Sequence, residues 1–578
     1  MHKVLVYSFP GEIDDLSHLF PNERLAQIAA VVRAAGAKVE IWDRADLGTL
    51  AAMGPRWWTR MLARFPAAYI FSRLAEKKPV SRLAQILCGL PLKLALSAMA
   101  AQVESNYRAF IRREARRIAD GGFSMILLNV WRGGFRHTME LARLTKQLRD
   151  VRIYATGQRV DWAREHVLDL YPQVDGLILG LGYDSIRRLA IGEDPETLSR
   201  VATRNKVPAA TDSLAPEDVT RIPEPCYDTA VYHGLDGLFP LIHVTLSNQA
   251  CPNECAFCVR PANYGRHVIR KAVTRVVDEI ERHMSAGIRH FRIADSTPPP
   301  QALTELAREI VARGLQRQGI RLTAFARVDS NRNEDFRLLK SANFMSLFFG
   351  IETLDDDGLK RACKGITYDQ IRKTLRGASK AGLFVIGSVI YPMPGETASS
   401  RARTLQRLNE LSMYLDSVLI QPAGVYPASP WGKNPERYGI ALHDDYIKRG
   451  VDYPVKFIVP MQFWPAFPFS YDLMDKPAGE VRFEDILGEF EKFSREVHGS
   501  LSTSDVQDYS LLVAGMIGKD PFELTDALKR ILVTRDYAAL SAMLRLAQNT
   551  TAVAERAARL VFSSSGAEDA SAGENLNP

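Results

Sequence analysis

The feature of this chain that most constrains its fold is an alternation of short apolar segments with helix-like segments, which occurs in two separate series. The first series starts at Val4 and ends near Leu179, and the second extends from Leu241 to Gln421. Strands that alternate with helices form parallel sheets, because each helix returns the chain to the starting end of the sheet. At 578 residues, the chain also exceeds the size that one hydrophobic core supports. The sequence therefore predicts an α/β protein of several domains.

The first series predicts a Rossmann-like, doubly wound parallel sheet in residues 1–200. A helical and basic insertion, at about residues 50–120, interrupts the alternation. Ligands of such sheets bind beyond the carboxyl ends of the strands, where glycine lets the backbone approach a ligand closely. Small residues at these ends are therefore candidate ligand-binding residues: Gly11, Gly133, Gly134, Thr156, Gly157, Gly180 and Gly182.

The rest of the chain divides into four further regions. Residues 201–238 contain a stretch rich in proline and acidic residues, which predicts an exposed linker. The second series, residues 239–432, contains six strand–helix units and predicts a partial (β/α)6 barrel. Residues 433–562 combine aromatic loops with short helices, which predicts an aromatic cap and a small, mainly helical C-terminal region. Residues 563–578 are small and polar and are expected to be disordered.

Composition excludes several classes of protein. The formal net charge is +7, and basic and acidic residues are interleaved along the chain, which does not predict nucleic-acid binding. Six cysteines are too few for a secreted disulfide scaffold, and the first residues form a strand pattern without a signal peptide, which predicts a cytoplasmic protein. The longest apolar stretch, Leu83 to Val103, contains Lys93 and Pro91, so it predicts a buried or partner-facing helix and no membrane span.

Three of the six cysteines, Cys251, Cys255 and Cys258, lie within eight residues, directly after the first strand of the second series. Thiolates at this spacing on a loop can converge on one metal centre. Three thiolates on a four-iron cluster leave one iron open for a substrate, as in a catalytic metal site. The alternative is a zinc site completed by Cys226 or His267, but the second pair of cysteines that zinc sites usually contain is absent from this sequence.

The CxxxCxxC loop, with Phe257 before its last cysteine, resembles the signature of the radical SAM superfamily. The resemblance implies a [4Fe-4S] cluster held by the three cysteines. It also implies that S-adenosylmethionine binds the fourth iron through its amino and carboxylate groups and is cleaved to a 5′-deoxyadenosyl radical. The resemblance also implies that Phe257 of the loop and residues at successive strand ends bind S-adenosylmethionine, with the turn at 391–397 near the adenine. At the second strand end, Asp295 and Ser296 depart from the family's usual Gly-Gly-Glu-like segment, although Asp295 keeps its acid. The residues at the following strand ends are Arg327, Asp329 and Glu352.

An open α/β domain before such a barrel resembles the cobalamin-dependent branch of this superfamily, the class B methyltransferases. The resemblance implies that the glycine loops, together with Trp131, hold cobalamin, although the Asp-x-His-x-x-Gly motif of other cobalamin proteins is absent from this sequence. It implies a C-methyltransferase that passes a methyl group through methylcobalamin to an unactivated carbon of a small-molecule or peptide substrate. An electron donor such as flavodoxin or ferredoxin is also implied. The alternatives are a non-methylating cyclase or rearrangement enzyme of the same family and a zinc-stabilised binding protein.

Overall fold

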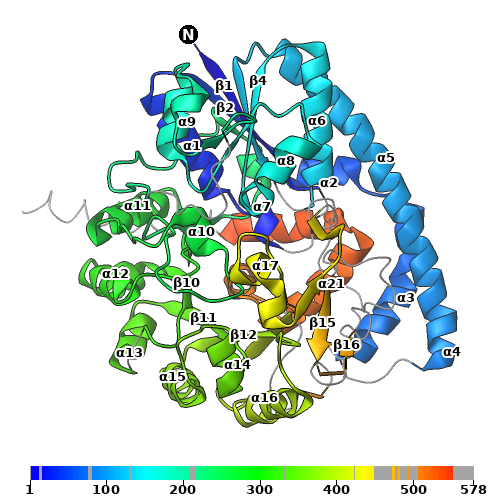
Figure 1. The fold of residues 1–578 in the computed structure, drawn as a ribbon, viewed down its shortest axis with the longest axis vertical. Helices are drawn as coiled ribbons and strands as arrows, with labels where there is room; N and C mark the ends of the chain where they lie inside the picture. The colour runs from blue at the N-terminus through cyan, green and yellow to red at the C-terminus, as the bar shows by residue number, and fades with distance from the viewer. Residues whose placement is uncertain are drawn as a thin grey trace, which may run out of the picture.

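The structure is a computed structural model, and it describes residues 2–11, 13, 16–75, 81–130, 133–206, 216–330, 333–421, 423–447, 471–475, 479–481, 492–493, 496–497 and 506–550. Two α/β domains are stacked on each other. The first domain (blue and cyan) lies above the second (green), with the amino terminus at the top (Figure 1). Because β1 (Lys3–Phe9) begins at the top, the carboxyl ends of its sheet point down toward the second domain.

The first domain contains a sheet of seven described strands in the order β6-β5-β4-β3-β1-β2-β7, parallel except for the pairing of β6 with β5. Side chains alternate between its two faces: Val4 and Val6 belong to the core under α1 and α9, whereas Leu5 and Tyr7 belong to the core under α5 and α6. The predicted doubly wound fold is confirmed. The elements are β2 (Lys38–Asp43), β3 (Met125–Val130), β4 (Arg152–Thr156), β5 (Gly176–Ile178), α1 (Glu23–Ala34), α6 (Phe135–Leu148), α7 (Gln158–Ala163), α8 (Glu165–Leu170) and α9 (Tyr183–Ala190).

The predicted linker at 201–238 is wrong, because this segment completes the first domain. Strand β6 (Val201–Ala202) pairs with β5, and β7 (Tyr232–His233) pairs with β2 at the opposite edge. Val219 and Leu238 are buried in the same core. Most residues of the segment are polar, so its few buried apolar residues form no pattern in the sequence. Residues 207–215 lie outside the described part of the chain.

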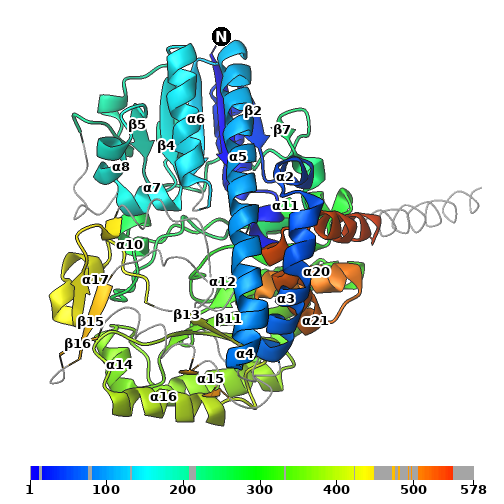
Figure 2. The same cartoon turned by 90° about the vertical axis from the view of Figure 1, so that its right-hand side faces the viewer.

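The helical insertion occurs where the sequence predicts it. It contains α2 (Leu47–Met53), α3 (Trp57–Ala75), α4 (Arg82–Ala84), the π-helical turn η2 (Gln85–Gly89) and the long helix α5 (Leu90–Asp120). Figure 2 shows α3 and α5 side by side, extending along the second domain. The second half of α5 packs on the first sheet and leads into β3.

The second domain is a partial barrel of six described parallel strands in the order β13-β12-β11-β10-β9-β8, which confirms the predicted (β/α)6 fold. Side-chain caps mark where its helices begin: Thr367 accepts a hydrogen bond from the backbone N–H of Gln370 at the start of α15. The strands are β8 (Leu241–Val244), β9 (His290–Ile293), β10 (Arg321–Ala326), β11 (Phe344–Glu352), β12 (Phe384–Ile390) and β13 (Ser417–Gln421). The helices are α10 (Arg260–Tyr264), α11 (Val273–Ser285), α12 (Ala302–Ala312), α13 (Asn333–Ser341), α14 (Asp356–Arg361), α15 (Tyr368–Lys380) and α16 (Ala398–Glu410).

The C-terminal region has two parts. Helix α17 (Pro430–Lys433) and a small sheet of β14 (Ile440–Leu442), β15 (Tyr471–Asp475) and β16 (Gly479–Val481) lie beside the barrel. Helix α20 (Asp508–Ile517) packs on the face of the barrel sheet that α11 to α16 leave open, where Leu511 meets Phe348 and Ile386. It is followed by α21 (Pro521–Thr534) and a helix at 537–550. Much of the predicted aromatic cap, from 448 to 470, and the predicted tail lie outside the described residues.

Candidate functional site

The three clustered cysteines lie on a loop at the carboxyl end of β8. The loop is held by backbone hydrogen bonds to segments distant in sequence: Cys251 N–H donates to the Gly265 carbonyl at 3.1 Å, and Ala256 N–H donates to the Ala362 carbonyl at 2.9 Å. The carbonyl of Ala256 in turn accepts from Trp431 N–H at 3.0 Å. The loop is therefore anchored to the turn after α14 and to α17, so its cysteines have fixed positions.

Each of the three sulfurs has a nitrogen neighbour. Asn253 Nδ2 lies 3.3 Å from the Cys251 sulfur, the Arg260 backbone N–H donates to the Cys258 sulfur at 3.4 Å, and Arg327 Nη1 lies 4.0 Å from the Cys255 sulfur. Burial raises the pKa of the Cys255 and Cys258 thiols, and the neighbouring cations oppose this effect. Hydrogen bonds to thiolate sulfur are a feature of iron–sulfur sites, so the donor set fits such a cluster.

A single zinc ion fits the described residues less well. Within the described part of the chain, no group of three His, Cys, Asp or Glu side chains is arranged to hold one metal ion. Of the two predicted fourth zinc ligands, Cys226 and His267, Cys226 has another partner, since Arg33 Nη1 donates to its sulfur at 3.2 Å. A four-iron cluster spreads its thiolates over separate iron atoms and does not require them to meet at one point.

Glu352, predicted to bind S-adenosylmethionine, forms a buried ion pair with Lys364, in which the carboxylate and ammonium lie 2.8 Å apart. The backbone of Glu352 is in the left-handed region, with φ of +68°. A Cβ atom at Gly350 would lie 2.6 Å from the Glu352 carboxylate and 2.9 Å from the ammonium of Lys364. Glycine at this position therefore provides the space for the ion pair, and backbone strain of this kind is concentrated at functional sites.

Lys364 connects Glu352 to the rest of the predicted site. Its ammonium lies 5.4 Å from the centre of the Phe257 ring, and its carbonyl accepts from Arg327 Nη2 at 3.0 Å. Arg327 also binds Asp329 through two hydrogen bonds of 2.9 and 3.1 Å. The structure thus brings together Phe257, Arg327, Asp329 and Glu352 beside the cysteine loop. The Phe257 ring packs 5.8 Å from the buried ring of Trp431, so Trp431 supports the cysteine loop and does not line an open pocket.

Asp295 and Ser296 have different surroundings from the other predicted residues. The buried Asp295 carboxylate accepts from Leu246 N–H at 2.6 Å and from the Ser247 hydroxyl at 2.5 Å, which ties the end of β9 to the end of β8. The hydroxyl of Ser296 is a partner of the Arg260 guanidinium. Both carboxylate oxygens of Asp295 are therefore already engaged, and its role as a brace between strands accounts for its burial without a ligand.

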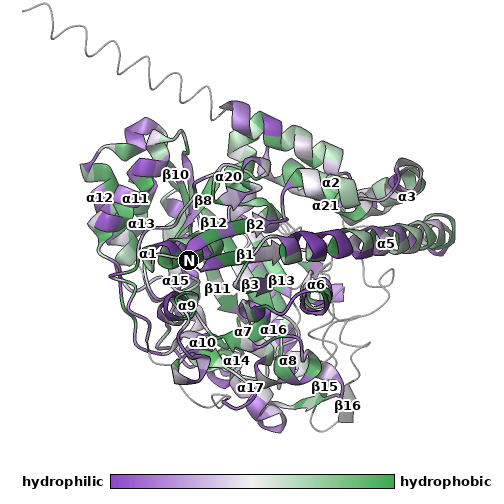
Figure 3. Ribbon diagram, turned by 90° about the horizontal axis from the view of Figure 1, so that it is seen from above, coloured by the Kyte–Doolittle hydropathy of each residue, from purple (hydrophilic) through white to green (hydrophobic). Residues whose placement is uncertain are grey.

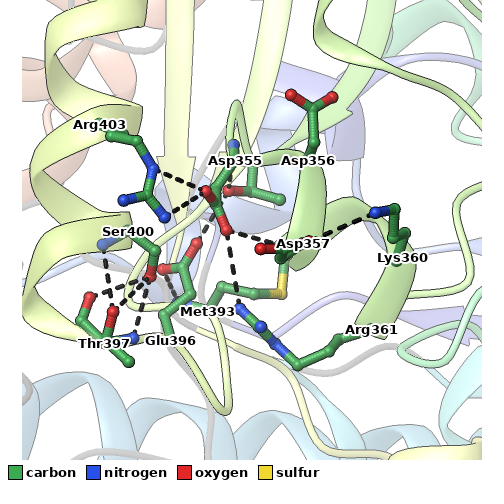
Figure 4. A network of polar contacts seen from close by, with 12 residues as sticks. Asp355, Asp356, Asp357, Lys360, Arg361, Met393, Glu396, Thr397, Ser400 and Arg403 are labelled. Atoms are coloured by element: carbon green, nitrogen blue, oxygen red, sulfur yellow. Dashed lines mark hydrogen bonds and ion pairs between the residues drawn. The ribbon is translucent and has the colours of Figure 1, made fainter.

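The turn at 391–397, predicted to lie near the adenine, is held by the buried Glu396. One carboxylate oxygen accepts from the Thr353 hydroxyl at 2.8 Å, and the other accepts from Met393 N–H at 3.1 Å. Burial raises the pKa of Glu396 to about 7. Figure 4 shows this network together with Asp355, which caps α14 and binds Arg403 at 2.8 Å. The network fixes the turn after β12 to the turn after β11.

A cavity of about 230 Å³ lies between the two domains. It is lined by residues that follow β1 and β5 of the first sheet and β8 and β9 of the barrel, including Glu23, Arg24, Tyr183, Thr245, Ser247, Lys271 and Ala294. The Thr245 hydroxyl donates to the Glu23 carboxylate at 2.7 Å and accepts from the Lys271 ammonium at 2.9 Å. Burial raises the pKa of Glu23 to about 7, and the charge of Lys271 opposes this shift. The carboxyl ends of both sheets therefore open into one space.

Glu23, Arg24 and Lys271 were missed by the sequence reading. Glu23 and Arg24 follow Asn22, whose side chain caps α1, and charged residues in the first turn of a helix are ordinary. Lys271 lies 248 positions away from Glu23, and no local pattern connects them. For Glu23 and Arg24, the signal was their position after the predicted loop at the end of the first strand.

The edge of the first sheet offers polar atoms to a ligand. Arg24 Nη2 donates to the Gly180 carbonyl at 2.6 Å and contacts the Thr156 hydroxyl, while Gly180 N–H donates to one oxygen of Asp161 at 2.8 Å. Arg24 Nε and the other oxygen of Asp161 are buried and have no hydrogen-bond partner among the described residues. Because buried polar atoms normally have partners, a ligand with amide or phosphate groups, such as a corrinoid, fits this edge.

The predicted glycines at the same edge are explained by contacts between loops. A Cβ atom at Gly134 would lie 1.9 Å from the Phe9 carbonyl, and one at Gly11 would lie 2.0 Å from the Gly133 carbonyl. At Gly157 the nearest atom would be the Val130 carbonyl, at Gly180 the Asn263 carbonyl and at Gly182 the Ile178 side chain. These glycines let strand-end loops pack on each other, so they account for the shape of the edge without a corrin ring. Trp131 lies outside the described residues.

The comparisons with known proteins agree with this arrangement. The model of the radical SAM superfamily matches residues 246–408. An uncharacterized methyltransferase of Pyrococcus horikoshii is 24% identical over 301 residues, 50% of this chain and 64% of that protein. The hopanoid C-2 methylase of Rhodopseudomonas palustris is 26% identical over 292 residues, 49% of this chain and 53% of that protein. The matched part of the chain thus spans less than two thirds of the length of these two relatives.

One solved structure is similar over nearly the whole chain. TsrM from Kitasatospora setae, a radical S-adenosylmethionine methyltransferase solved with cobalamin and a [4Fe-4S] cluster bound, covers 93% of this chain and 100% of its own, with a TM-score of 0.57 and 15% identity. At this identity the similarity concerns the fold. The order of an open α/β domain, a partial barrel and a C-terminal region is therefore shared with TsrM.

Proposed function

From a chain whose residues 246–408 form a domain of the radical SAM superfamily, we infer a cobalamin-dependent C-methyltransferase. It transfers a methyl group from S-adenosylmethionine through cobalamin to an unactivated carbon of a small-molecule or peptide substrate. The observation that carries this proposal is the cavity between the domains, which the carboxyl ends of both sheets share. Two cofactors that must act on one substrate need such a common space.

The cysteine loop would hold the iron–sulfur cluster, and the cofactors when bound supply an alkyl radical and a transferable methyl group. The chain contributes three thiolates and the N–H groups that stabilise them, from Asn253, Arg260 and Arg327. Phe257 of this loop packs on the buried ring of Trp431, which supports the loop. An electron donor of the flavodoxin or ferredoxin type would dock from outside the chain.

The residues around Lys364 would bind S-adenosylmethionine. Arg327 and Lys364 offer cationic groups that suit its carboxylate, and Glu352 offers an anionic group that suits ribose hydroxyls or the amine. The buried Asp295 carboxylate at the end of β9 accepts from Leu246 and Ser247 at the end of β8, so we assign Asp295 to positioning these two strand ends. The turn held by Glu396 would lie against the adenine.

The edge of the first sheet would hold cobalamin through Arg24 and Asp161, whose unpaired atoms suit the amide side chains of a corrinoid. Carbon as the methyl acceptor is supported by the names of relatives, since a hopanoid C-2 methylase and a tryptophan 2-C-methyltransferase are both similar to this chain. Their substrates differ, so the names support the reaction and not one acceptor.

The proposal is tested by anaerobic reconstitution followed by metal and corrinoid analysis. The protein should contain iron, sulfide and cobalamin. With S-adenosylmethionine labelled in its methyl group and an extract of metabolites, the label should appear in a product. If deoxyadenosine forms but no product carries the label, the non-methylating alternative is correct. If the protein contains zinc and neither iron nor sulfide, both enzyme readings are wrong.

A further inference from the structure

In the described part of the chain, the helical insertion carries most of the large apolar side chains that are exposed. Of the fifteen large hydrophobic side chains exposed in the described residues, ten lie between positions 57 and 94, and each of these is 44 to 73% exposed. They come from α3 and from the segment that contains α4, η2 and the start of α5: Trp57, Trp58, Met61, Leu62, Phe65, Leu83, Ile86, Leu87, Leu90 and Leu94. We call this set the apolar arm. Contiguous exposed apolar surface on a folded protein usually marks a binding surface.

The exposed face is separate from the face that packs α3 against α5. Ala63 and Ala67 of α3 are buried against Leu92, Ala95 and Met99 of α5, together with Val533 of α21. On α3, the exposed positions 57, 61 and 65 repeat every four residues, as one face of a helix requires. Helices α3 and α5 therefore each have one apolar side that packs against the other helix and a second apolar side that is exposed. Figure 3 shows α3 and α5 projecting from the rest of the protein, with hydrophobic residues toward their far ends.

The sequence around the apolar arm has an excess of positive charge. Residues 47–103 contain eight basic residues and one acidic residue. Their excess of seven positive charges equals the formal net charge of the whole chain, which means that the remaining residues balance to zero. Arg56, Arg64, Arg82 and Lys93 are exposed beside the apolar side chains. The partner of this surface must therefore combine an apolar interior with negative charge.

We propose that the apolar arm docks on the surface of a lipid bilayer that contains anionic lipids. Helices with basic residues beside tryptophan, phenylalanine and leucine bind at the boundary between headgroups and acyl chains. A second copy of this chain would bring the same positive charge to the contact, so charge complementarity favours the anionic bilayer. This site is separate from the proposed methyltransferase site and does not depend on it.

The arm lies on the bilayer and does not cross it. The helix at Arg82–Asp120 is long and apolar enough for a span by length and composition. However, Val103, Tyr107, Ile111 and Ala115 are buried in the core of the first domain, so about the second half of the helix is committed to that domain. Only the apolar arm is available to contact the membrane. Its exposed Lys93 suits a position at the boundary between headgroups and acyl chains.

The test is co-sedimentation of the purified full-length protein with phosphatidylcholine vesicles, with and without phosphatidylglycerol. We expect binding to the anionic vesicles that weakens as salt increases and is weak on pure phosphatidylcholine. Leu87→Asp with Leu94→Asp, and separately Arg56→Glu with Arg64→Glu, should each lower the partition coefficient by about ten-fold or more, because each apolar or basic group contributes on the order of 1 kcal/mol at the interface.

Matched controls use exposed residues elsewhere. Leu148→Asp on α6, and Lys373→Glu with Arg376→Glu on α15, should leave binding unchanged. The salt dependence of the wild-type protein tests the proposal even if a variant fails to fold. Absence of binding to anionic vesicles would overturn it, as would equal binding to both vesicle types. A concentration-dependent dimer without vesicles, dissociated by Leu87→Asp with Leu94→Asp, would assign the arm to a second copy and also overturn it.

Discussion

At the scale of single residues, the contacts of Lys364 explain why the charges of the site are buried together. Its ammonium pairs with Glu352, faces the Phe257 ring and influences the Cys255 thiol. Two buried charges persist only when each satisfies the other, and a strained Glu352 backbone with a glycine two residues before it keeps them in contact. The ion pair is therefore a buried structural element of the site and not a surface contact.

Glu352→Gln should weaken the binding of S-adenosylmethionine by about ten-fold, the value of one hydrogen bond to a charged group. The absorbance of the iron–sulfur cluster should not change, because the Glu352 carboxylate accepts hydrogen bonds from Lys364 and Ser388 and not from a residue of the cysteine loop. Equilibrium binding measures the affinity. Glu254→Gln on the exposed part of the cysteine loop is the control and should bind normally. An unchanged affinity in Glu352→Gln would remove this residue from the site.

Cys255→Ala should abolish the charge-transfer absorbance of the cluster and the formation of deoxyadenosine, because two thiolates and one alanine no longer hold three irons. Absorbance spectroscopy and chromatography of the reaction mixture measure both effects. Cys226→Ala is the control: its sulfur accepts from Arg33 of α1, so this variant should retain both signals. Deoxyadenosine formation by Cys255→Ala would contradict the assignment of the cysteine loop.

At the scale of elements, the turns after β11 and β12 depend on Glu396. Its two carboxylate oxygens accept from Thr353 and Met393, and its burial raises its pKa to about 7 from an ordinary value of 4.5. The folded protein therefore holds the proton of Glu396 up to about pH 7, whereas the unfolded chain loses it near pH 4.5. Between these values the folded state binds more protons, so the contribution of Glu396 to stability falls as pH rises.

Glu396→Gln removes this titration and keeps the shape of the side chain. Relative to the wild type, the variant should gain up to roughly 3 kcal/mol of stability between pH 4.5 and pH 7.5, which corresponds to the cited shift in pKa. Chemical denaturation over this range measures the difference between the two proteins, which isolates Glu396 from other titrating groups such as Glu23. A difference that does not vary with pH would show that Glu396 is ionised in the folded protein.

At the scale of the whole molecule, the two domains meet through backbone as well as side chains. The Ala262 carbonyl of α10 accepts from Arg164 Nη2 at 2.9 Å, and Gly180 lies directly against the Asn263 carbonyl. The Glu23 to Thr245 hydrogen bond joins α1 to the end of β8. The spacing of the domains, and with it the width of the shared cavity, is therefore determined by close contacts at the carboxyl end of the first sheet.

Gly180→Ala should destabilise the protein by about 2 to 4 kcal/mol. About 1 kcal/mol comes from placing alanine at a positive φ and the rest from its Cβ, which would lie 2.4 Å from the Asn263 carbonyl. Gly122→Ala is the matched control, because its φ is +71° and no atom lies within 4 Å of the added Cβ. Thermal unfolding measures both. Equal effects of the two substitutions would mean that the domains do not press on each other at Gly180.

Taken by itself, the sequence determined both α/β sheets, the cysteine loop and most of the polar residues beside it. Apolar periodicity depends on neighbours within a few positions, and the cysteine spacing lies on one loop, so both are visible without a fold. The resemblance added Arg327, Asp329 and Glu352 because they follow consecutive strands of the barrel.

Only the tertiary structure decided how distant residues share contacts. It placed strands β6 and β7 of the 201–238 segment in the first sheet, made Asp295 a brace, and explained Gly11, Gly134 and Gly180 by loops that touch. It also placed Glu23 beside Lys271 and left the apolar arm exposed. These outcomes depend on how the two domains and the helical insertion pack, and packing brings together residues that no local pattern connects.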